Sequence, residues 1–366
     1  MNIPEITKDH IFEEVNRGRY RAKNRLFRSA AVTLNTDPSG RINDEVIGIY
    51  EKMAAGGVGT ICYEAVPVLR YERLTQDFFN LPKDQMLGSY VNYFDSDDMI
   101  EEHKRLVSAV KKYDTQIVMQ LVLSTYKRKN EDGSFNPVDL DNLTGEEFKE
   151  IENAFVDCAI RASKAGYDGI QLHLAHGFFL CRLISRFCNH RTDEYGTDRL
   201  KLIRNIYKRI RDNVSEDFQI GVKINEYEFM TDEQEKEEGS RNISAVPICK
   251  ELFDMGFDLV EFSGKPAMRC GIKPYENEAY FQDSAYELKK LVSLNKDKTV
   301  AVTGGNRSPQ YINSLYLRTG IDVYGICRPL IREANLPNRW KSGDLRASKC
   351  LSCNRCGSAV DCPFEE

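Results

Sequence analysis

Apolar and polar positions follow a repeated unit along the chain. An amphipathic stretch leads to a glycine, and two or three residues later a mostly apolar run begins. The clearest copies are AAGGVGTICYEA (54–65), KAGYDGIQLHL (164–174), DMGFDLVEFSG (254–264) and RTGIDVYGICRP (318–329). Glycine just past a helix supplies the left-handed conformation in which many helices end. A continuous apolar run is typical of a parallel strand buried on both faces. The repetition therefore predicts repeated helix–strand units.

Eight such runs predict eight strands, at 25–32, 58–65, 115–122, 167–174, 219–225, 257–264, 299–305 and 321–328. Helical spacing of apolar residues separates most of them, most clearly at 151–166 and 199–213. Eight strands alternating with helices favour an α/β fold, a closed (β/α)8 TIM barrel, over an open doubly wound sheet. We assign residues 1–340 to the barrel and 341–366 to a basic linker with a short Cys-rich C-terminal tail.

Polar residues interrupt five of the buried strands near their C-terminal ends. They are Glu64, Gln120, His173, Lys223 and Glu261. Any one of them is compatible with a hydrogen-bonded core group. Five at matching depth instead predict a site at the C-terminal mouth of the barrel, where barrel enzymes place their active sites. Long connections at 66–98, 123–145 and 226–243 are expected on the same face.

The last two strands end in a pattern suited to phosphate. Gly304 and Gly305 follow the seventh strand, and Gly325 and Arg328 end the eighth. Barrels commonly bind phosphate at these two strands. Glycines let backbone N–H groups approach an anion, and arginine offers a paired set of donors. The alternative is two ordinary loops with one surface arginine.

Several segments, in order and at the expected strands, resemble one known family. They are KNRLFRSA (23–30), GGVGTICYEA (56–65), VMQL (118–121), HLAHGF (173–178), NHRTDEYG (189–196), GVKIN (221–225), TGGNRS (303–308) and CRPLIREANLPNRW (327–340). The chain resembles the old yellow enzyme, or NADH:flavin oxidoreductase, family. The branch includes 2,4-dienoyl-CoA reductase, 2-enoate reductase and trimethylamine dehydrogenase.

This resemblance implies non-covalent FMN. Backbone groups of Ser29, Ala30, Ala31 and Ala65 are expected to line the flavin. Gln120 would bond the pyrimidine edge, and Lys223 would lie near N1, where a cation stabilises the reduced ring. The phosphate would be held by Gly304, Gly305, Asn306, Cys327 and Arg328.

The resemblance also implies a substrate-binding pair, His173 and His176, which would grip an electron-withdrawing oxygen and stabilise a developing enolate. Family ene-reductases carry a proton-donating tyrosine two residues after the second histidine. Here that position is Phe178, and the replacement donors we consider are Tyr63, Cys181 and Tyr275.

Three functions follow as hypotheses. The first is an FMN-dependent oxidoreductase acting on a small unsaturated or carbonyl-activated molecule. Its expected reductant is NADH or NADPH. No Gly-rich dinucleotide-binding motif appears in the sequence, but the resemblance implies that the nicotinamide can stack directly on FMN without one. The second is an electron-transfer subunit with flavin and an iron–sulfur centre. The third is a Schiff-base lyase that uses Lys223.

Eleven cysteines occur in the chain, and four of them fall within thirteen residues of the tail. Cys350, Cys353, Cys356 and Cys362 form C-x2-C-x2-C-x5-C-P. The first three have the spacing that opens a bacterial ferredoxin motif. Multidomain relatives of the resembled family place a [4Fe–4S] cluster just after the barrel. We expect such a cluster, fed by a ferredoxin-like donor. Zinc, or thiols that only pack, are the alternatives.

Composition limits the classes of binding partner and the cellular location that we expect. The formal net charge is −5, so nothing indicates nucleic acid. No apolar run approaches 18 residues, so we expect no membrane span. Residues 1–28 are polar and lack a secretory signal pattern, which predicts a cytoplasmic protein. An oligomer is compatible with the sequence.

Overall fold

Eight parallel strands close into a barrel in the structure, a computed structural model that describes residues 9–37, 39–71, 91–239, 241–265, 268–356 and 362–364. The strands are β3 (Leu26–Arg28), β4 (Thr60–Pro67), β5 (Gln116–Val122), β8 (Gly169–Leu174), β9 (Gln219–Asn225), β10 (Leu259–Ser263), β11 (Thr299–Val302) and β12 (Val323–Gly325). They follow one another around the barrel in chain order, and β12 pairs with β3 to close it. The predicted barrel is therefore confirmed.

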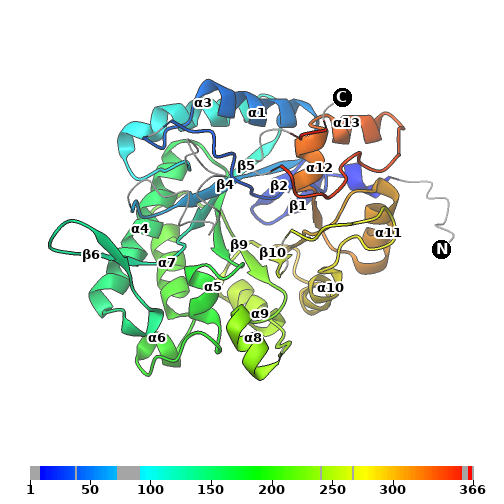
Figure 1. Ribbon diagram of the computed structural model, residues 1–366. Helices are drawn as coiled ribbons and strands as arrows, with labels where there is room; N and C mark the ends of the chain where they lie inside the picture. The colour runs from blue at the N-terminus through cyan, green and yellow to red at the C-terminus, as the bar shows by residue number, and fades with distance from the viewer. Residues whose placement is uncertain are drawn as a thin grey trace.

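Helices lie outside the strands, as Figure 1 shows. The main helices after successive strands are α1 (Asp44–Ala55), α3 (Ile100–Lys111), α4 (Gly145–Lys164), α7 (Lys201–Arg211), α9 (Val246–Met255), α10 (Gln282–Leu291) and α11 (Pro309–Thr319). Two short helices, α12 (Cys327–Arg332) and α13 (Leu336–Lys341), end the barrel and lead into the tail. None of the helices in the described parts of the chain is long and apolar enough to cross a bilayer.

Smaller elements decorate both ends of the barrel. Three further helices are α5 (Phe179–Ile184), α6 (Glu194–Thr197) and α8 (Asp232–Glu238), and short 3-10 turns are His10–Phe12, Asp97–Met99 and Leu140–Asn142. The strands β6 (Lys127–Lys129) and β7 (Phe135–Pro137) form a hairpin in the long connection after β5. Part of the long connection predicted at 66–98 lies outside the described residues.

An antiparallel hairpin closes the N-terminal end of the barrel. It consists of β1 (Val15–Arg17) and β2 (Tyr20–Ala22). Its buried side chains form one hydrophobic cluster with inward-facing side chains of the strands, namely Phe27, Cys62, Val118, Leu259, Ala301 and Val323. The N-terminal half of the barrel interior is therefore filled with apolar side chains, which leaves the C-terminal half for polar groups.

The seventh strand of the barrel is shorter than the sequence predicted, because glycine conformations follow it. The run 299–305 contributes only Thr299–Val302, since Gly304 and Gly305 have φ angles of 112° and 78°. Side chains other than glycine rarely adopt such angles. The chain therefore turns away from the barrel wall where phosphate binding was expected.

A recurring aspartate explains part of the repeated unit. Each of Asp168, Asp258 and Asp322 precedes a barrel strand and accepts a hydrogen bond from the backbone N–H of the preceding barrel strand. The donors are Ile117 (2.8 Å), Ile220 (2.8 Å) and Val300 (2.9 Å). These carboxylates supply acceptors for N–H groups at the N-terminal rim of the barrel, where the ladder ends.

We expect Asp322→Ala to destabilise the fold more than Asp168→Ala. Asp322 also binds the Lys289 ammonium at 2.7 Å, and both side chains are under 10% exposed. Breaking a buried ion pair costs about 3–5 kcal/mol. Asp168 is 28% exposed, so its loss costs nearer to about 1–3 kcal/mol. Urea midpoints of the two variants measure the difference, and equal losses would contradict this account.

Candidate functional site

A connected set of polar side chains lies inside the barrel, near the C-terminal ends of the strands. The Glu261 carboxylate on β10 is fully buried. It accepts hydrogen bonds from Ser29 Oγ at 2.6 Å and Gln171 Nε2 at 2.8 Å. The same carboxylate lies 3.2 Å from the Lys223 ammonium, whose side chain is 4% exposed. Three donors, from the residue after β3 and from strands β8 and β9, thus converge on one buried anion, which fixes their side chains.

The network continues to the predicted flavin-binding glutamine. Gln120 Nε2 donates to Gln171 Oε1 at 2.7 Å, and the two residues are register partners on β5 and β8. Ala65 is the register partner of Gln120 on β4. The Ser29 hydroxyl also contacts the hydroxyl of Thr303 after β11. The structure therefore brings Ser29, Ala65, Gln120 and Lys223 together at one mouth.

The two alanines after Ser29 continue the wall of the mouth. Ala30 packs partly buried against the interior cluster. Ala31 is also partly buried, and its carbonyl accepts a hydrogen bond from the guanidinium of Arg28 at 3.1 Å. The carbonyl of Ala31 is thus already engaged in this structure.

Glu64 does not join the ring of polar residues that the sequence predicted. A register shift between Tyr63 and Ala65 forms a bulge in β4. Because of this extra residue, Glu64 accepts hydrogen bonds from Thr33 at 2.6 Å and from Tyr50 on helix α1 at 3.3 Å. Burial raises the pKa of Glu64. The expectation that it faces the mouth is wrong, since the bulge turns it toward the helix layer.

The two predicted substrate histidines lie together above this network. Their ring centroids are 5.0 Å apart. Nδ1 of His173 accepts a hydrogen bond from the Ala175 backbone N–H at 3.2 Å, so the proton of the neutral ring is on Nε2. Nε2 of His176 lies 2.8 Å from the Ser263 hydroxyl, and its backbone N–H donates to Asn225 Oδ1 at 3.1 Å.

Both rings are held neutral. Burial lowers the pKa of His173 well below its usual value, with further contributions from His176 and the Lys223 cation. Burial and Lys223 lower the pKa of His176 to about 3. A neutral imidazole with hydrogen on one nitrogen is a hydrogen-bond donor near neutral pH. The arrangement can therefore polarise an oxygen without supplying a full positive charge.

Of the three replacement proton donors, one contacts this site. The Tyr63 ring packs at tilted or edge-on angles against Tyr50, His103 and Tyr167, toward the helix layer. The Tyr275 hydroxyl donates to Gln310 at 3.0 Å. Cys181 accepts a hydrogen bond from Asn225 Nδ2 at 3.4 Å, and burial raises its pKa to about 12. Phe178 packs edge-on against His173, with centroids 4.8 Å apart.

A small cavity opens where β11 and β12 end. Its volume is about 60 Å³, enough for several waters and hence for a phosphate group. Its lining includes the five predicted phosphate residues, Gly304, Gly305, Asn306, Cys327 and Arg328. The backbone N–H groups of Gly304, Gly305 and Asn306 have no acceptor among the described residues. Unpaired donors around a small cavity fit an anion.

Gly325 and the side chain of Asn306 shape the cavity in which that anion would bind. A Cβ added to Gly325 would lie 1.7 Å from the Thr303 hydroxyl. The Asn306 side chain donates to the carbonyls of Val302 and Gly325, both at 3.0 Å, and so ties the ends of β11 and β12 together. Its side chain positions the cavity, which leaves its backbone N–H for a ligand.

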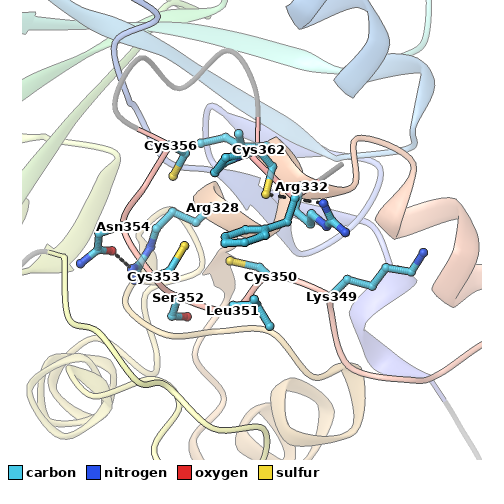
Figure 2. Close-up of a pocket in the computed structure, with 13 residues that line it drawn as sticks. Arg328, Arg332, Lys349, Cys350, Leu351, Ser352, Cys353, Asn354, Cys356 and Cys362 are labelled. Atoms are coloured by element: carbon cyan, nitrogen blue, oxygen red, sulfur yellow. Dashed lines mark hydrogen bonds between the residues drawn. The ribbon is translucent and has the colours of Figure 1, made fainter. Parts of the chain in front are cut away.

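The four tail cysteines line a second cavity beside the first. Figure 2 shows Cys350, Cys353, Cys356 and Cys362 among the residues that line it. The volume of this cavity is about 100 Å³. Arg332 contacts the Cys362 sulfur at 3.7 Å. No three Cys, His, Asp or Glu side chains in the described ranges are close enough to hold a single metal ion. Arg328 and Ser352 line both cavities.

Sequence reasoning missed several members of these groups. Gln171 could have been found, because it lies two residues before His173 in a buried strand and so points to the same side. Asn225 and Ser263 are polar residues at strand ends and carry a similar signal. Ser352 gave no signal, since only the folded tail brings it to the cavity.

We expect His173 to be a neutral Nε2–H imidazole in solution. Nitrogen NMR of protein labelled at histidine, recorded at about pH 6, reports the tautomer directly. The spectrum of a His173→Gln variant assigns the resonance. A protonated ring, or a proton on Nδ1, would contradict the geometry around Ala175.

Known proteins resemble this chain at the level of fold and sequence. A solved 2-naphthoyl-CoA reductase complex superposes with a TM-score of 0.74 over 95% of this chain and 54% of its own, at 17% identity. The old yellow enzyme homologue from Zymomonas mobilis superposes with a TM-score of 0.67 over 96% of this chain and 97% of its own, at 19% identity. These likenesses confirm the barrel.

Sequence relatives are closer. The NADH oxidase of Thermoanaerobacter brockii is 27% identical over 94% of this chain and 53% of the relative. The NADPH dehydrogenase of Bacillus pumilus is 24% identical over 89% and 92%. The chain spans about half the length, or less, of the first curated relatives it matches. Residues 10–346 match the NADH:flavin oxidoreductase / NADH oxidase family. The chain therefore belongs to this family of FMN-dependent oxidoreductases, as its motifs predicted.

Proposed function

We propose that this chain binds FMN across the C-terminal mouth of its barrel and passes reducing equivalents from NADH or NADPH to a small unsaturated or carbonyl-activated molecule. One observation carries the proposal. The small cavity, whose N–H groups have no acceptor among the residues that the structure describes, opens at the same mouth as the Gln120–Lys223–Glu261 network. A ligand with a phosphate at one end and a polar ring at the other matches both.

The residues divide into two sets in this proposal. FMN, when bound, supplies hydride transfer. Gly304, Gly305 and Arg328 hold the phosphate, and Gln120 bonds the polar edge of the ring. Lys223 provides a cation beside that ring, and the Glu261 carboxylate keeps the ammonium in place. Family membership supports this role of Lys223 over the Schiff-base lyase.

The histidine pair binds the substrate. His173 donates from Nε2 to an electron-withdrawing oxygen and stabilises negative charge that develops there. His176 is fixed by Asn225 and Ser263 and offers a second polar group beside it. Phe178 has no proton to give, so Cys181, whose sulfur contacts Asn225, is the side-chain donor that we retain.

The cysteine pocket is the second redox element that we propose. Zinc thiolate bonds of about 2.3 Å would gather the ligands closely. The four cysteines line one cavity, and the first three have the spacing that opens a bacterial ferredoxin motif, so a [4Fe–4S] cluster is the metal centre that we propose. With such a cluster, a ferredoxin-like protein is a further electron donor that we propose.

The cytoplasmic location that the sequence predicts stays a prediction.

Anaerobic titration tests the proposed function. Protein loaded with FMN should bleach when NADH or NADPH is added and recover its colour with a panel of enones. A colourless protein that fails to take up FMN would contradict the proposal. Trapping of a carbonyl substrate on Lys223 by borohydride would support the lyase instead.

We expect Lys223→Met to lower the midpoint potential of bound FMN by tens of millivolts, on the order expected for losing one nearby charge. The variant leaves Glu261 buried without its cation, which also costs stability. The double variant Lys223→Met/Glu261→Gln removes both charges and serves as the control. An unchanged potential in the single variant would place Lys223 away from the ring.

We expect anaerobically purified protein to contain about four iron and four sulfide per chain. Cys353→Ser should lose the iron. Cys270→Ser should retain it, because this exposed cysteine does not line the pocket. If metal analysis finds one zinc per chain and no iron, the pocket is a structural zinc site. If it finds neither metal, the tail has no redox role.

A further inference from the structure

Ser352 belongs to the cysteine-rich segment but reaches the phosphate cavity. It stands between Cys350 and Cys353 and lines both the cysteine pocket and the cavity at the ends of β11 and β12. It is 5% exposed. Among the described residues beyond α13, it alone lines the phosphate cavity. The tail therefore forms one wall of a site that strands β11 and β12 otherwise build.

The Ser352 hydroxyl is oriented by Arg307, the residue after Asn306. Arg307 Nη1 donates to Ser352 Oγ at 3.2 Å. A hydroxyl that accepts in this way still has its own hydrogen to give, and no acceptor for it occurs among the described residues. The hydroxyl hydrogen is thus available to a ligand in the cavity.

Arg307 is itself fixed on both sides. Its backbone N–H donates to the buried carboxylate of Glu278 at 2.8 Å, and its guanidinium donates to the carbonyl of Ile272. Its carbonyl accepts from the Ser348 N–H at 2.8 Å, at the start of the cysteine segment. A rigid link therefore runs from the loop before α10, through Arg307, to the tail.

The tail holds an unusual backbone at this point. Ser352 and Asn354 have φ angles of 52° and 59°. Residues with a side chain seldom adopt this region, and they keep it where surrounding contacts enforce it. Asn354 supplies such contacts, because it donates to the Met268 carbonyl at 2.8 Å and accepts from Arg328. The conformation presents Ser352 toward the cavity.

We propose that Ser352 is a phosphate ligand and that the cysteine-rich segment thereby closes the FMN phosphate site. The inference rests on the proposed function, since it names a residue of the same site. Ser352 donates its hydroxyl hydrogen to a phosphate oxygen, while Arg307 holds the hydroxyl oxygen. The neighbouring Cys350 and Cys353 couple the position of Ser352 to whatever fills the cysteine pocket.

FMN and riboflavin titrations separate this role from a structural one. Riboflavin has the same ring as FMN but no phosphate. Ser352→Ala should weaken FMN binding about 10-fold, as expected for one hydrogen bond to a charged group, and leave riboflavin binding unchanged. Ser352→Gly removes the hydroxyl and tolerates the positive φ, so it gives the same readout if the alanine variant folds poorly. Quenching of flavin fluorescence measures both affinities.

Ser342→Ala is the matched control, because its exposed hydroxyl donates to the Arg339 carbonyl away from the cavity. It should bind FMN as the unaltered protein does. Unchanged FMN affinity in both Ser352 variants would overturn the inference, and so would an equal loss of FMN and riboflavin binding. Failure of the unaltered protein to bind FMN would instead overturn the proposed function beneath it.

Discussion

The carboxylate of Glu261 is buried inside the barrel, and the polar half of the interior depends on it. A charge without solvent must be compensated by donors, and here Ser29, Gln171 and Lys223 provide them. Ser29 follows β3 directly, Gln171 lies on β8 and Lys223 on β9, so a single anion sets the positions of side chains from three parts of the barrel. Gln171 in turn fixes the side chain of Gln120, because it accepts a hydrogen bond from the Gln120 amide. The floor of the mouth is therefore arranged by the chain's own residues.

The N-terminal end of the barrel carries contacts that stabilise the fold, and the C-terminal end carries groups that can bind a ligand. At the N-terminal end, Asp168, Asp258 and Asp322 satisfy backbone N–H groups, and the β1–β2 hairpin fills the opening. At the C-terminal end, the N–H groups of Gly304 and Gly305 face a cavity and have no acceptor in the described part of the chain. Stability and binding are thus separated along the barrel axis, as is general in this fold. The tail then joins the C-terminal end through Arg307 and Ser352.

Much of this architecture could be predicted, because the repeated unit of amphipathic stretch, glycine and apolar run is a local signal, and so are the polar residues near the ends of those runs. Gln120, His173 and Lys223 lie where strand periodicity put them. Glu64 does not, because the bulge that redirects it leaves no mark in the pattern of apolar residues. Ser352 was also out of reach, since its partner Arg307 is 45 residues away in the sequence. Contacts of this kind exist only in the folded chain.

The central claim is that one ligand spans the cavity at β11 and β12 and the polar network of the mouth. A crystal structure of the protein with FMN measures this directly. We predict the phosphate against the N–H groups of Gly304 and Gly305, beside Arg328, and the polar edge of the ring against Gln120 and Lys223. A flavin bound elsewhere, or one whose phosphate points away from the cavity, would contradict the account.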